Sequence, residues 1–175
     1  MTQRPLVNLK SRRFTVNLPT EDYERLTALA MRNTIARSTM AWIILHDWLD
    51  DNQSLLNEYY QRLSVEQGNR PSWEIEHEIL GQYKRLARSG ARDNSEGDRV
   101  ELSLSIPSWD NRRLIGHASR YKVSKTEMWR RAVIPYLRSR DEEIAQFWNN
   151  ACQWLGKPLD ETKALLIADF EKQGR

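Results

Sequence analysis

The sequence predicts a mainly α-helical fold with one two-stranded antiparallel β-ribbon, built from two repeats that pair within one chain. Residues 13–18 alternate strictly between polar and apolar side chains, which is the pattern of a β-strand with one buried face. The same alternation returns 88 positions later, at residues 101–106. Each stretch is followed by a proline and then by apolar residues at helical spacing. Such a strand needs a partner for its backbone groups and its apolar face, and the second copy can supply one.

Composition limits the classes of protein and of site to consider. The 175 residues are 39% hydrophobic and 29% charged, which indicates a soluble globular chain with its own core. The apolar run at 40–45 is too short to span a bilayer, and residues 1–5 lack the apolar segment of a signal peptide. We therefore expect a cytoplasmic protein with no membrane partner. The single cysteine, Cys152, cannot form an internal disulfide and argues against a cysteine metal site.

Five segments follow one another along the chain. They are a basic N-terminal arm at 1–12, a first repeat at 13–50, a helical insertion with its linker at 51–98, a second repeat at 99–138 and a C-terminal helical extension at 139–175.

The first repeat is expected to contain a strand and two helices. Pro19 ends the strand, and a helix over about 20–33 follows, with Thr20 as its N-cap. Asn33 suits a left-handed position at the end of that helix. The second helix is expected to run from about 37 to 50.

The second repeat matches the first without a gap. Aligning 12–49 with 100–137 gives eight identical pairs, where average residue frequencies supply about two by chance. Apolar positions are also kept in type, so the match indicates a duplicated unit with a pseudo-twofold axis. Ser124 and Glu127 fit a capping box at the start of the second helix, whereas the equivalent Ala36 lacks a capping hydroxyl.

The two attached segments are also expected to be helical. Residues 51–98 contain two apolar helical patterns separated by a turn near 68–72, which allows the second strand to return antiparallel to the first. In the second half, Pro135 is expected to bend or end its helix. An amphipathic helix follows from about 142 to 155, and Asp160 is expected to cap a final helix.

Each repeat is expected to hold a strand, a helix, a turn and a second helix in under 40 residues. Polar residues alternate along the strand, and hydroxyl residues lie near the start of the second helix. This arrangement resembles the ribbon-helix-helix fold of the Arc and methionine repressors. In that family two protomers pair their strands into an antiparallel ribbon that enters the DNA major groove, and four helices form the core. Here the resemblance is to the tandem members, with both halves in one chain, and it covers about 13–50 and 99–138. It implies that double-stranded DNA is the main partner.

The outward face of the expected ribbon carries the candidate base-contacting residues. Antiparallel pairing about the pseudo-twofold axis is expected to set Thr15 near Ser103, Arg13 near Ser105 and Asn17 near Glu101. Arginine suits guanine and asparagine suits adenine, so the two different strands predict an asymmetric half-site. A carboxylate near phosphates is repelled, so Glu101 would accept from a cytosine amino group or hold Asn17. The alternative is an ordinary solvated sheet face.

The helix starts and the arm carry the candidate phosphate-contacting residues. Free amides, the helix dipole and basic or hydroxyl side chains there suit an anion. The residues are Arg37, Ser38 and Thr39 in the first repeat, Ser124, Lys125 and Thr126 in the second, and Lys10 and Arg12 in the arm. The alternative is plain capping with solvent-exposed bases.

Positive charge is concentrated on the two repeats. Counted along the sequence, the net charges are +3 for 1–49, −4 for 50–98, +7 for 99–140 and −3 for 141–175, within an overall +3. This separation indicates a basic module with acidic attachments, as expected if one face meets nucleic acid.

No pattern predicts an enzyme. The three histidines, His46, His77 and His117, lack metal-ligand spacing, and no glycine-rich phosphate loop occurs. We therefore expect no catalytic residues, metal or cofactor.

Three functions stay open at this level. A transcriptional repressor is expected first, and an accessory DNA-binding protein of plasmid transfer or maintenance second. A third is an antitoxin or helical adaptor that binds a protein through 51–90 or 141–175. Molecules bound to adjacent half-sites could also associate with one another. The expected setting is prokaryotic or viral, or a mobile genetic element.

Overall fold

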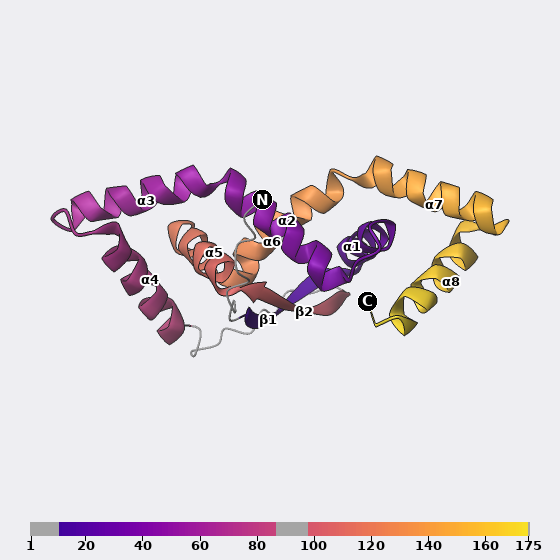
Figure 1. Ribbon diagram of the computed structural model, residues 1–175, viewed down its shortest axis with the longest axis horizontal. Helices are drawn as coiled ribbons and strands as arrows, with labels where there is room; N and C mark the ends of the chain where they lie inside the picture. The colour runs from indigo at the N-terminus through magenta and orange to yellow at the C-terminus, as the bar shows by residue number, and fades with distance from the viewer. Residues whose placement is uncertain (1–10, 87–97, 175) are drawn as a thin grey trace, which may run out of the picture.

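The computed structural model describes residues 11–86 and 98–174, which are mainly helical with one two-stranded antiparallel sheet. The elements are β1 (Ser11–Pro19), α1 (Thr20–Arg32), α2 (Arg37–Asp51), α3 (Gln53–Glu66), α4 (Ser72–Leu86), β2 (Arg99–Pro107), α5 (Ser108–Arg120), α6 (Lys125–Arg138), α7 (Asp141–Leu155) and α8 (Leu159–Lys172). In Figure 1 the ribbon formed by β1 and β2 lies below α1, α2, α5 and α6. The N-terminal hairpin (α3 and α4) and the C-terminal hairpin (α7 and α8) extend to opposite sides.

The duplication extends along the whole described chain. A strand followed by four helices occurs twice, and the first four elements of each set begin 88 residues apart, as Gln53 of α3 and Asp141 of α7 do. The expected insertion and the expected extension thus hold equivalent places in the fold. Their buried positions agree in type, with Leu56 and Tyr60 of α3 corresponding to Ile144 and Trp148 of α7.

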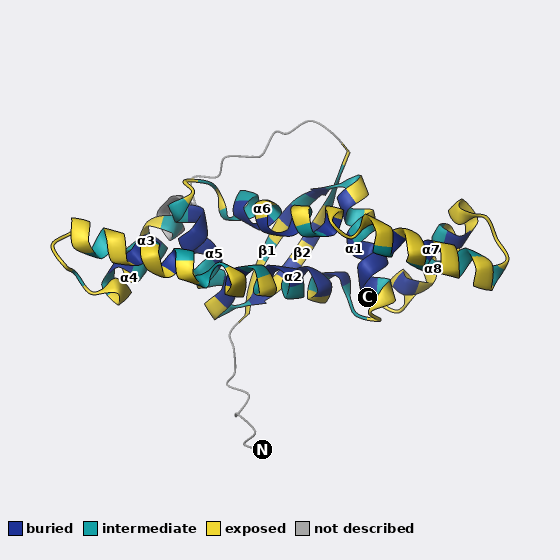
Figure 2. Cartoon of the chain, turned by 90° about the horizontal axis from the view of Figure 1, so that it is seen from above, coloured by how far each residue is buried: buried dark blue, intermediate teal, exposed yellow. Residues whose placement is uncertain are grey.

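The apolar face of the ribbon is the floor of the main core. β1 and β2 pair along their full length, and alternation sends Val16, Leu18, Leu104 and Ile106 to one side, where all four are almost completely buried. Helices α1, α2, α5 and α6 cover that side. Figure 2 shows the buried residues gathered along the middle of the molecule, with exposed residues on the outer faces of both hairpins.

Each hairpin packs on the opposite repeat. The helices α3 and α4 lie against α5, where Leu56, Tyr60, Ile75, Ile79 and Ile115 form a second apolar cluster. A side-chain carbon added at Gly116 of α5 would lie 2.8 Å from Leu56 Cδ1, so this close approach requires glycine. Helix α7 lies against α1.

Two buried carboxylates tie the repeats together. Asp22 of α1 and the equivalent Asp110 of α5 are fully buried. Asp22 accepts hydrogen bonds from Arg138 of α6, at 2.9 and 3.1 Å. Asp110 accepts one from the indole nitrogen of Trp42 in α2, at 2.8 Å. Since Arg138 and Trp42 come from the opposite repeat, these bonds cross the pseudo-twofold axis.

Two expected caps of the first helix were wrong. Thr20 is the first residue of α1 rather than its N-cap, and its hydroxyl donates to the carbonyl of Asp98 at 3.1 Å. Asn33 has a φ of −92°, and the left-handed residue is the next one, Thr34, with a φ of 56°. Lys122, at the equivalent place after α5, has a φ of 54°. Both repeats therefore turn between their helices in the same way.

Three other local expectations differ at least in part from the structure. Pro135 lies inside α6, which continues to Arg138, so the proline does not end the helix. Asp160 is the second residue of α8, whose N-cap is Pro158. The strand begins at Ser11, so it takes in the end of the expected arm, and residues 1–10 lie outside the described residues. Among the described residues, no helix has both the length and the apolar character needed to cross a membrane.

Replacing a buried aspartate should destabilise the fold. Asp22→Ala or Asp110→Ala leaves buried donors without their acceptor and should lower the free energy of unfolding by about 3 kcal/mol. Asp160→Ala, which removes an exposed first-turn acid, should cost less than about 0.5 kcal/mol. Urea unfolding at one pH measures all three, and equal costs would contradict the role given to the buried pair.

Stability should fall in acid because of His117. This residue is fully buried against Trp48, with ring centroids 4.9 Å apart. Neither ring nitrogen has a hydrogen-bond partner among the described residues. Burial, helped by Arg120 and Arg113, lowers the pKa of His117 from 6.5 to about 4. In the unfolded chain His117 therefore binds a proton near pH 6.5, whereas in the folded chain it binds one only near pH 4.

The free energy of unfolding should therefore decrease by up to roughly 3 kcal/mol as the pH falls through that range. His117→Leu installs the residue found at the equivalent position, Leu29, and should remove this part of the pH dependence. Urea unfolding at pH 7 and at pH 4.5 compares the two proteins. An unchanged pH dependence in the variant would rule out His117 as its source.

Candidate nucleic-acid interface

The six residues expected to contact bases lie on the outward face of the ribbon. The strand register sets Arg13 opposite Ser105, Thr15 opposite Ser103 and Asn17 opposite Glu101, which confirms the expected pairing. Five of the six are exposed and Asn17 is half-buried. The result is one continuous polar strip two strands wide.

A groove lies along this strip. Its volume is about 490 Å³, and it is lined by Arg13, Thr15, Ser103 and Ser105 together with Ser38 of α2. Within residues 11–86 and 98–174, no hydrogen bond or ion pair occupies the Arg13 guanidinium. At the other end of the strand, Arg130 of α6 donates to the carbonyl of Asn17 at 3.0 Å. The ribbon is thus anchored on α6 at one end and has an available cation at the other.

At the start of α2, the Arg37 side chain is buried in the protein. Arg37 is only 8% exposed, and its Nε donates to the Thr27 hydroxyl at 2.8 Å. Its guanidinium lies over the rings of Tyr23 and Phe170, 5.1 and 5.0 Å from their centroids, and pairs with Glu171 of α8 at 3.2 Å. Aromatic rings and a carboxylate thus hold Arg37 inward, away from the surface where a phosphate would approach. Ser38 is half-buried beside the groove, and Thr39 is exposed.

At the start of α6, only one of the two hydrogen bonds of the expected capping box forms. The hydroxyl of Ser124 accepts from the backbone N–H of Glu127 at 3.0 Å, which confirms it as the N-cap. The Glu127 carboxylate pairs with Arg131 at 2.9 Å, and it also pairs with Arg130, so the reciprocal half of the capping box was wrong. In α2 the equivalent Ala36 offers no capping side chain.

Lys125 is also turned toward the protein. Its backbone N–H donates to the Tyr83 hydroxyl at 2.9 Å, and its Nζ donates to the Asn111 side chain at 3.1 Å. The ammonium lies 4.1 Å from the centroid of the Phe14 ring. Burial, with a further contribution from Arg12, lowers the pKa of Lys125 to about 8. An amine held this way gains charge stabilisation from any anion that approaches it.

The remaining predicted phosphate contacts lie at the edges of this region. Thr126 is half-buried in the first turn of α6. Arg12 is exposed in β1. Lys10 lies outside the described residues.

Aromatic residues of the hairpins reach both helix starts, which the sequence analysis missed. Tyr83 of α4 contacts Lys125, and Phe170 of α8 contacts the equivalent Arg37. The two aromatic residues hold the same place in their hairpins. The repeat continues beyond residue 49 in the fold, but residue identity there is too weak to reveal the correspondence in the sequence.

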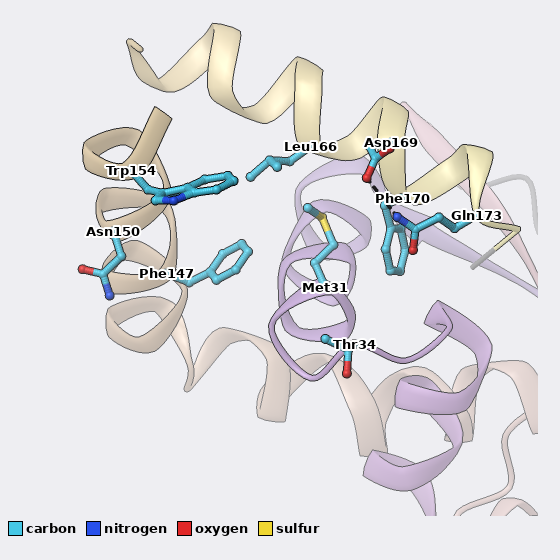
Figure 3. A pocket seen from close by; sticks show the side chains of 10 residues that line it. Met31, Thr34, Phe147, Asn150, Trp154, Leu166, Asp169, Phe170 and Gln173 are labelled. Atoms are coloured by element: carbon cyan, nitrogen blue, oxygen red, sulfur yellow. Dashed lines mark hydrogen bonds between the residues drawn. The ribbon is translucent and has the colours of Figure 1, made fainter. Parts of the chain in front are cut away.

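A separate apolar pocket lies at the C-terminal hairpin. Its volume is about 440 Å³, and Figure 3 shows Phe147, Trp154 and Leu166 projecting around it from α7 and α8, with Met31 of α1 nearby. Trp154 is 80% exposed. This pocket is away from the ribbon and shares no lining residue with its groove.

Metal ligands do not gather in the described ranges: no three His, Cys, Asp or Glu side chains of residues 11–86 and 98–174 are placed to hold one ion. Comparison of the chain with protein-family models, with curated proteins and with solved structures finds no match.

The unequal capping of the two helix starts can be measured. Ser124→Ala removes the cap of α6 and should lower the free energy of unfolding by about 1 kcal/mol. Ala36→Ser supplies the missing hydroxyl at the equivalent position and should raise it by about 0.5 kcal/mol. Urea unfolding of both variants tests this, and a destabilised Ala36→Ser protein would show that the α2 start has no place for a cap.

Proposed function

We propose that this protein binds double-stranded DNA as a tandem ribbon-helix-helix protein, with the outward face of its β-ribbon in the major groove. One observation carries the proposal. Six polar side chains from strands 88 residues apart in sequence lie side by side on an exposed two-stranded surface. The core is formed by the opposite face of the ribbon, so the composition of this strip is available for recognition.

The dimensions and chemistry of the strip suit base reading. A two-stranded ribbon fits the major groove, where each base pair presents a distinct pattern of donors and acceptors. Arg13 offers a planar pair of donors for guanine, and Asn17 offers an amide for adenine. Thr15, Ser103 and Ser105 can donate or accept. Because the two strands differ at every paired position, we expect the DNA site to be asymmetric.

The placement of charge supports docking from the ribbon side. The two repeats are basic, and the segments containing the hairpins are acidic. In Figure 1, α3 and α7 extend outward on the side away from the ribbon, and α4 and α8 descend to the level of the ribbon on either side of it. A duplex centred on the ribbon would contact the basic repeats, which favours its approach.

We propose repression of transcription as the use of this binding, because a protein seated in the major groove at a promoter obstructs the polymerase. Binding beside a nick site would instead indicate an accessory role in plasmid transfer. The apolar pocket beside Trp154 favours a second candidate, an adaptor that binds a protein partner. Such an adaptor would show no salt-sensitive affinity for DNA.

Replacing Arg13 should weaken DNA binding and relax its sequence preference. Arg13→Ala removes a bidentate base contact and should cost about 1–3 kcal/mol of binding free energy. Arg62→Ala is the matched control, because it removes an arginine from the exposed face of α3, and it should leave affinity and preference unchanged. Fluorescence anisotropy with the preferred duplex and with a scrambled one measures both quantities. Equal behaviour of the two variants would exclude Arg13 as a base reader.

The preferred duplex is obtained by selecting bound sequences from random DNA at two salt concentrations. A short asymmetric motif with steep salt dependence is expected. Salt-sensitive binding without a motif would indicate a packaging role. No binding at low salt would reject the DNA proposal.

A further inference from the structure

A second pocket, here called the basic pocket, lies where β1, α4, α5 and α6 meet. Its volume is about 470 Å³. Among the described residues that line it, four are cationic, namely Arg12, Arg13, Arg112 and Lys125, and none is acidic. Tyr83 and Asn111 add hydrogen-bonding groups to its wall. Such a concentration of positive charge in a cavity favours an anionic occupant.

The equivalent place in the other half is filled by the protein itself. There the Arg37 guanidinium lies between Tyr23 and Phe170 and pairs with Glu171. In the basic pocket the equivalent of Arg37 is the shorter Lys125, and Asn111 replaces the Tyr23 ring. The half with α4 therefore has an open cavity where the half with α8 has a closed stack. The two halves can therefore be compared directly: in one, the Glu171 carboxylate is paired with the cation at the helix start, and in the other the equivalent place is a cavity.

Within the described part of the chain, the cations of the basic pocket have no strong counterion. Lys125 Nζ meets a neutral amide oxygen of Asn111 and the face of Phe14. Arg112 pairs with Glu76 at 3.0 Å, but its side chain is 55% exposed, and exposed ion pairs contribute little. Burial, with a further contribution from Arg12, lowers the pKa of Lys125, which agrees with an electropositive site.

We infer that the basic pocket binds a phosphate group, with Arg12, Arg112 and Lys125 as its cationic ligands. Arginine guanidinium groups match the geometry of phosphate oxygens, and a lysine ammonium adds a point charge. Two sources carry this chemistry. One is a backbone phosphate of a duplex on the ribbon, which rests on the proposed function. The other is a free phosphorylated small molecule, which does not.

Calorimetric titration of the full chain with pyrophosphate at low salt tests the pocket without DNA. We expect saturable binding of one pyrophosphate per chain. Arg112→Gln should weaken it by about tenfold, because a charge-assisted contact is lost. Glu76→Gln should tighten it, because Arg112 is released from its ion pair, and a gain of affinity cannot come from misfolding. Arg62→Gln, a charge change of the same size on α3, should leave binding unchanged.

Absence of saturable pyrophosphate binding would overturn the proposal, as would equal affinities for Arg112→Gln, Glu76→Gln and the Arg62→Gln control. The selected duplex then separates the two sources. Displacement of pyrophosphate by the duplex, with weaker duplex binding by Arg112→Gln, assigns the pocket to a backbone phosphate. Simultaneous binding of both assigns it to a free ligand. If no duplex binds at all, the DNA proposal fails while the pyrophosphate result still decides the pocket.

Discussion

The rest of the structure depends on the pairing of β1 with β2. Each strand has one apolar face and a row of unpaired backbone groups, and neither can be satisfied alone. Their antiparallel pairing fixes an approximate twofold axis, and every helix then takes its place relative to that axis. The same pairing sends Val16 and Leu104 into the core and leaves Arg13, Thr15 and Ser103 outside. Core formation and the exposure of the polar strip are thus two results of one interaction, because side chains alternate with a period of two.

Contacts across the axis make the two halves interdependent. Asp22 and Asp110 each accept from an arginine of their own helix and from a donor of the opposite repeat, and each hairpin covers the first helix of the other half. Without the other half, each buried carboxylate would lose the donor from across the axis and each hairpin would be uncovered. Within this near-symmetry the two helix starts have diverged. Arg37 is enclosed by aromatic rings, whereas Lys125 borders an open pocket. The two equivalent places have different surroundings because the residues around them differ, with Lys125 and Asn111 standing where the other half has Arg37 and Tyr23.

The sequence predicted the features that depend on periodicity and missed those that depend on distant partners. Strict alternation and the ungapped repeat were sufficient for the strand register, including Thr15 beside Ser103. Thr20 was misjudged because its hydroxyl bonds to Asp98, 78 residues away. Arg37 was misjudged because a long basic side chain can reach solvent or a buried ring, and Phe170 and Glu171 decide between them. The equivalence of the hairpins was missed because their positions keep only apolar character, as Tyr60 and Trp148 do.

Joining both strands in one chain has a consequence for how such a protein responds to its abundance. When a two-stranded reader assembles from separate subunits at concentrations below their dissociation constant, the amount of active species rises with the square of subunit concentration. Here the strand partners are covalently linked, so the ribbon does not dissociate on dilution. Occupancy of a single site would then rise in simple proportion to the number of molecules. If the proposed DNA binding holds, a fused protein of this kind responds gradually at low copy number, whereas an assembling one would lose its active form.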